Sequence, residues 1–138
     1  MLLDDMGDYL STGGLGLTTG TNLFLGTLPD SPDTAAAVYE TGGFFPIHAM
    51  SASAGNAAVE RPRIQIVTRA AKYQTARQLM HNIFTRLDGL GDTTINSTRY
   101  LHMTAVSSPA AIGTDPSGRA RMVLNLDVVK KLHTSTST

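Results

Sequence analysis

The chain has 138 residues, of which 41% are hydrophobic and 16% charged, and its formal net charge is zero. This length suits one ordinary domain, and the composition excludes both a disordered chain and the long apolar run of a membrane span. The absence of cysteine excludes disulfides, thiolate metal sites and cysteine nucleophiles. We therefore expect a single domain over residues 1–138.

Residues 1–12 are predicted to form a short amphipathic helix, because apolar residues recur at helical spacing from Leu2 to Leu10 and glycines follow. Asp4 and Asp8 are spaced i to i+4 and can share one helix face, although a favourable interaction of acids with the helix N-terminus is the commoner explanation. Acids also occupy the place where a secretory signal carries bases, so we expect synthesis in the cytoplasm.

The glycine cluster Gly13–Gly20 follows a helix and precedes a strand. A dinucleotide-binding fingerprint has the reverse order, with the phosphate at the N-terminus of a helix. We interpret the cluster as a flexible connection. Residues 22–29 and 35–41 are then predicted to be two strands, joined by the turn-forming PDSPD as a hairpin.

Residues 42–62 have neither a strand period nor a helix period, and are predicted to form a long loop. Loops of this length are usually either functional or disordered. The adjacent aromatic residues Phe44 and Phe45 lie within it and need an explanation.

The second half of the chain contains one long amphipathic helix, which is expected to pack on a sheet. The predicted order is about αβββαβββ, an α+β fold with a mixed or mostly antiparallel sheet and a short N-terminal helix. Residues 132–138 are expected to be a frayed tail. The elements of this half are predicted at residues 62–70 (strand), 73–90 (helix), 93–95, 98–107 and 119–129 (strands).

No catalytic, cofactor-binding or metal-binding residue can be assigned. A nucleophile elbow and a P-loop are missing, and the histidines include no metal-spaced pair. An enzyme is therefore the least favoured class. A small nucleic-acid or ligand binding module is the alternative from another class, although aromatic residues are not interleaved with the basic ones. The histidines are His48, His81, His102 and His133.

Charge is unevenly distributed along the chain. Residues 1–60 contain seven acidic and no basic residues, whereas residues 61–138 contain eleven basic and four acidic ones. Such asymmetry can mark complementary faces that meet between copies of the chain. The alternative is that the charges pair or are solvated within one copy.

The chain resembles the tail terminator family of long-tailed bacteriophages, often labelled minor capsid or head-tail joining proteins. The resemblance spans nearly the whole chain and depends on the order of its segments rather than on a catalytic signature. These segments are LLDDMGDYL, NLFLGTLPDSPD, VYETGG, ERPRIQIV, ARQLMHNIFTRLDGL, TTINSTRYL and SSPAAIGTDPSGRARMVLNLDV.

The resemblance implies a structural virion protein that is not an enzyme. Its copies would form a hexameric ring at the head-proximal end of the tail tube, stop tube polymerisation and present the surface to which the head attaches. The implied partners are the tail tube protein and a head connector or completion protein, with DNA only in passage and no membrane. A head-completion or connector ring protein is the alternative within this class.

A ring requires contacts in which one patch meets a different patch on the next copy. We hypothesise that the segment after Gly42 and Gly43 supplies such a contact, since aromatic residues and methionine are enriched at interfaces. The rival interpretation is that Phe44 and Phe45 cover the core of their own domain. The interface residues of this hypothesis are Phe44, Phe45, Ile47, Met50, Arg61 and Arg63.

Overall fold

The computed structural model describes residues 2–47 and 59–131. Within these ranges the chain forms two helices and seven strands, so the predicted α+β class is confirmed. In chain order the elements are α1 (Leu2–Ser11), β1 (Leu23–Leu25), β2 (Ala35–Ile47), β3 (Val59–Ala70), α2 (Tyr73–Leu87), β4 (Gly91–Ile95), β5 (Thr98–Ala105), β6 (Ala110–Thr114) and β7 (Ala120–Lys131).

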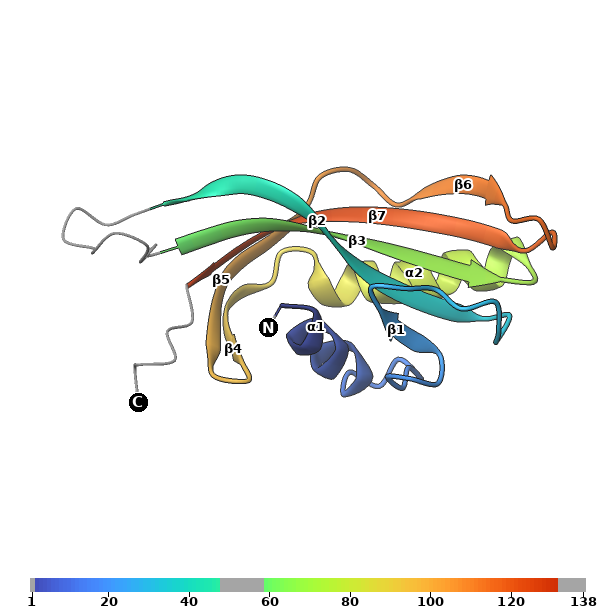
Figure 1. Cartoon of the computed structure of the whole chain (residues 1–138), viewed down its shortest axis with the longest axis horizontal. Helices are drawn as coiled ribbons and strands as arrows, with labels where there is room; N and C mark the ends of the chain where they lie inside the picture. The colour runs from blue at the N-terminus through green and yellow to red at the C-terminus, as the bar shows by residue number, and fades with distance from the viewer. Residues whose placement is uncertain (1, 48–58, 132–138) are drawn as a thin grey trace.

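The strands form one mixed sheet in the order β1-β2-β3-β7-β5-β4, with β6 also paired to β7 (Figure 1). Every pairing is antiparallel except that of β1 with β2. One edge of β7 serves two strands. Its first half pairs with β6, where Ala110 lies opposite Val123, and its second half pairs with β5, where Tyr100 lies opposite Lys130.

The hydrophobic core lies between one face of the sheet and the two helices, which Figure 1 shows on the same side of the sheet. Alternate residues of β7 from Met122 to Val128 are buried on this face. The Thr68 hydroxyl donates a 3.1 Å hydrogen bond to the Ala76 carbonyl and so joins β3 to α2. The prediction of a long amphipathic helix packed on a sheet is confirmed. Its buried residues are Ala76, Met80, Ile83 and Leu87.

The predicted loop over residues 42–62 is wrong at both of its ends. Residues 42–47 continue β2 and residues 59–62 begin β3, so the two strands form one long antiparallel pair. Two register shifts interrupt the pairing, and Gly42 has a φ of +79° at the first shift. Bulges of this kind break the alternation on which strand prediction depends, which explains why the glycines and Pro46 suggested a loop. Residues 48–58 lie outside the described residues.

The predicted hairpin between the first two strands is also wrong. Strand β1 covers only Leu23–Leu25 and pairs with β2 in parallel, with Leu23 opposite Ala36. Parallel neighbours require a crossover instead of a tight turn. Here the connection over residues 26–34 makes that crossover. The composition of PDSPD indicates turns but not whether the two strands run parallel or antiparallel.

Strand β6 was not predicted, so the observed order contains one strand more than αβββαβββ. All five of its residues are exposed, and its sequence AAIGT lacks the alternation of a half-buried strand. It is a strand only because its backbone pairs with that of β7. The predicted tail at residues 132–138 lies outside the described residues.

Candidate functional site

The sheet face opposite the helices, here called the outer face, carries a polar ladder across β3 and β7. The Arg63 guanidinium donates a 2.7 Å hydrogen bond to the Asp127 carboxylate, and the Gln65 amide donates a 3.2 Å bond to the Asn125 amide oxygen. The hydrogen bond to Asp127 and the charge of that carboxylate raise the pKa of Arg63. The ladder makes this part of the outer face a polar surface that water reaches, with Arg63 and Asp127 side chains 36% and 35% exposed.

Five of the six predicted interface residues lie at the far end of the β2–β3 pair. The backbones of Phe44, Phe45 and Ile47 lie in β2, and their side chains are outside what the structure describes. Phe44 is the register partner of Arg61 on β3. Met50 lies outside the described residues. The structure therefore brings Phe44 and Arg61 side by side in the backbone ladder, whereas Arg63 belongs to the polar ladder with Asp127.

This end of the β2–β3 pair projects past both helices in Figure 1. Strand β1 pairs only with Ala36–Val38, so among the described residues the outer edge of β2 has no strand partner beyond Tyr39. An open edge can accept a strand from another chain, but bulges and proline discourage such pairing. Both are present between Glu40 and Ile47, so this segment suits a contact made by side chains rather than by added backbone hydrogen bonds.

The connection between β1 and β2 is clamped onto the outer face by two arginines. Arg69 of β3 donates to the carbonyls of Pro32 and Asp33. Arg119, which is 7% exposed, binds the carboxylates of Asp30, Asp33 and Asp115 at 2.7, 3.3 and 2.8 Å. Burial opposes ionisation of Asp115, but hydrogen bonds from Arg119 still hold its pKa below the ordinary value.

The sequence offered little signal for this clamp. Arg119 is 86 residues from Asp33 and 89 from Asp30. Only the contact between Asp115 and Arg119 joins residues that are close in sequence, at the two ends of the turn sequence DPSGR. Contacts over such separations depend on the sheet topology, which the sequence alone did not fix.

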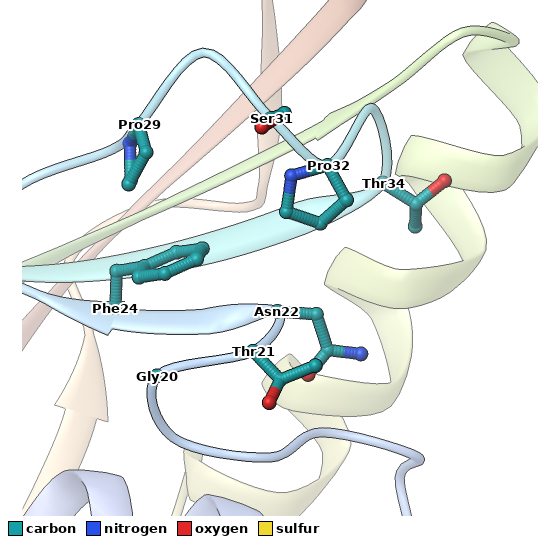
Figure 2. Close-up of a pocket in the computed structure, with 8 residues that line it drawn as sticks. All are labelled: Gly20, Thr21, Asn22, Phe24, Pro29, Ser31, Pro32 and Thr34. Carbon is teal, nitrogen blue, oxygen red and sulfur yellow. The ribbon is translucent and has the colours of Figure 1, made fainter.

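A shallow hollow of about 690 Å³ lies beside β1 and the same connection. Figure 2 shows the Phe24 ring and the side chains of Pro29 and Pro32 around it. None of its lining residues is an acid or a base, so the hydroxyls of the lining have no activating base within it and the hollow offers a contact surface. Its lining residues are Gly20, Thr21, Asn22, Phe24, Pro29, Ser31, Pro32 and Thr34.

The acids of α1 take part in a structural network. Asp5, which is 2% exposed, accepts hydrogen bonds from the Tyr100 hydroxyl and, at 3.1 Å, from the Asn96 amide. The same amide donates a 2.6 Å bond to Asp8. Burial, together with the hydrogen bond to Asp5, raises the pKa of Tyr100, so its hydroxyl remains a donor. The network joins α1 to β5 and to the turn before it.

Replacing Tyr100 with phenylalanine is expected to lower the free energy of unfolding by about 1 to 2 kcal/mol, because the buried Asp5 carboxylate loses a donor. Urea unfolding of the variant and the parent protein measures the difference. Tyr73→Phe is the matched control, since Tyr73 is 47% exposed. Equal destabilisation by the two substitutions would contradict the role of the Tyr100 hydroxyl.

Metal-binding groups and membrane-spanning helices are both absent from the part of the chain that the structure describes. Within residues 2–47 and 59–131, no group of histidine, aspartate and glutamate residues could hold a metal ion. In the same ranges no helix has the length and apolar character needed to cross a membrane.

Comparisons with known proteins agree with this picture. The family model described as bacteriophage tail terminator protein matches residues 9–132. A solved chain from the virion of a native gene transfer agent particle aligns with a TM-score of 0.63 and 18% identity, over 95% of each chain. A second solved chain, without a functional name, aligns with a TM-score of 0.61 and 10% identity, over 97% of this chain and 93% of its own length.

At these identities the two solved structures establish the fold alone. No curated protein matches the sequence. The family match extends from α1 to the end of β7 and so includes almost every element described above. The chain therefore belongs to the bacteriophage tail terminator family, whose members are structural proteins of the phage virion.

Proposed function

We propose that copies of this chain form a ring that closes the head-proximal end of a phage tail tube. The role is structural and involves no catalysis. The ring, of six copies, ends tube polymerisation and forms the surface to which the head attaches. The match of the tail terminator family over residues 9–132 carries this proposal.

The charge distribution supports a ring. Each subunit of a closed ring must present two different surfaces that fit one another. Part of the charge asymmetry is used within one copy, where Asp30 and Asp33 pair with Arg119 and Glu60 with Lys130. The acids and bases outside these pairs supply opposite charges on one chain. Complementary charge favours the correct contact and suppresses wrong ones.

The end of the β2–β3 pair is the proposed contact segment. It projects past the helices and has an open, bulged edge, as described above. Aromatic side chains, methionine and arginine are enriched at protein interfaces, and this segment contains all three. The partner is a neighbouring copy, the tail tube or the head connector. The contact residues of this proposal are Phe44, Phe45, Ile47, Met50, Arg61 and Arg63.

Electron microscopy of tails assembled from the cognate tail proteins tests the proposal directly. Without this chain, we expect overlong tubes with open head-proximal ends. With it, tubes should have uniform length and a capped end. Identical tubes in both samples would reject the terminator function and favour a head-completion or connector ring, which binds the portal side instead.

A further inference from the structure

Two arginines lie directly opposite each other on the outer face of the sheet. Arg69 of β3 and Arg121 of β7 are register partners in an antiparallel pair. Like charges at such positions destabilise a sheet. Both residues line a hollow of about 460 Å³, here called the arginine pocket, whose ionisable lining residues are Asp30, Tyr39, Arg69, Asp115, Arg119 and Arg121.

The acids of the arginine pocket all bind Arg119 rather than this pair. Arg69 is 3% exposed and donates only to backbone carbonyls, those of Pro32 and Asp33. Arg121 donates a 3.3 Å bond to the Thr114 carbonyl, and its buried Nε has no partner. Within the described residues, neither guanidinium forms an ion pair with a carboxylate.

This arrangement leaves hydrogen-bonding capacity unused. A buried polar group without a partner costs free energy and needs an explanation, such as a ligand that supplies the missing acceptor. Burial and the charge of Arg119 lower the pKa of Arg69, although the charges of Asp115, Asp30 and Asp33 oppose this shift. A carboxylate relieves both costs, because its planar pair of oxygens matches the guanidinium fork.

We propose that the arginine pocket receives the Asp4 carboxylate of a neighbouring copy of this chain. Asp4 is exposed on α1, and no hydrogen bond or ion pair engages it within the described residues. Helix α1 covers the sheet face opposite the pocket. A head-to-tail ring needs two different surfaces of one chain to meet, and the pocket and α1 are two such surfaces on opposite faces of the sheet.

The proposal depends on the ring of the proposed function and names one of its contacts. The occupant is a second copy because the chain itself carries an exposed acid on α1. Other acids of residues 1–60 are engaged within one copy: Asp30 and Asp33 bind Arg119, and Glu60 pairs with Lys130. Asp8 lies one turn further along the exposed side of α1, but its carboxylate is already engaged by Asn96. Asp4 is therefore the acid of α1 that remains available.

A charge swap tests the contact in the full-length chain. The single variants Asp4→Lys and Arg121→Glu are expected to weaken assembly by about tenfold or more, because each places like charges across the contact. The double variant carrying both changes restores opposite charges at every contact of the ring and should recover assembly. Glu40→Lys with Arg121→Glu is the matched control, with the same net charge as the double variant and no expected recovery.

Assembly is measured as self-association by sedimentation velocity and as occupancy of tube ends by electron microscopy. Single variants that assemble like the parent protein, or a double variant that fails to recover, would overturn the contact. If the double variant recovers self-association in solution but neither it nor the parent protein caps tubes, the contact is supported and the terminator function is rejected. Because a folding defect would not be repaired by a second charge change, recovery is specific to the proposed pair.

Discussion

Replacing Arg119 with alanine is expected to lower the free energy of unfolding by about 3 kcal/mol and the melting temperature by roughly 10 °C. The Arg119 and Asp115 side chains are both only 9% exposed, and their contact distance is 2.8 Å. Removing the guanidinium leaves the Asp115 carboxylate in a partly dehydrated site without its cation. Asp30 and Asp33 contribute less, because their side chains are 94% and 70% exposed and water screens these contacts.

Urea unfolding measures the change in free energy, and limited proteolysis reports on the connection over residues 26–34. Faster cleavage there is expected, since Arg119 is one of the two arginines that clamp this segment. Arg77→Ala is the matched control: Arg77 is exposed on α2, so its loss should change stability by less than about 0.5 kcal/mol. A similarly small change at Arg119 would show that the clamp contributes little to folding.

The elements that could be predicted from the sequence are those whose apolar residues repeat with a clear period. The long helix and β7 bury one regular face each, so helical spacing up to Leu87 and alternation from Met122 to Val128 identified them. The turn at Asn96 and Ser97 was predicted from its residue types, and both residues have positive φ angles that such turns require.

The elements that could not be predicted lack such a period. Strand β6 has no buried residue, and β2 is interrupted by two register shifts near Gly42. The parallel pairing of β1 depends on contacts of the crossover with Arg69 and Arg119, which are distant in sequence. The same holds for the arginine pocket, because only the register of β3 with β7 places Arg69 opposite Arg121.

The interface hypothesis concerns the β2–β3 end, where the sequence predicted a loop and the structure has strands. Two adjacent phenylalanines in a small-residue segment are the basis of this hypothesis, which stays a prediction. The structure corrects their setting, from a loop to strand β2 with Arg61 as the register partner of Phe44. Mutation distinguishes burial of these two side chains on a partner from burial in the core of their own chain.

Replacing both Phe44 and Phe45 with serine is expected to abolish capping of tail tubes while leaving the melting temperature of the isolated chain within about 3 °C of the parent protein. The physical reason is that apolar area buried only in the assembly contributes nothing to folding of the single chain. Tube length and end shape by electron microscopy measure capping, and thermal unfolding of the isolated chain measures stability.

Phe84→Ser is the matched control for the loss of an aromatic ring. Phe84 packs against the hydrophobic core from α2, so its replacement is expected to cost about 3 kcal/mol of folding free energy. The portion of this variant that remains folded should still cap tubes. If the double serine variant instead melts as early as Phe84→Ser, the two phenylalanines belong to the core of their own chain and the β2–β3 contact must be made by other residues.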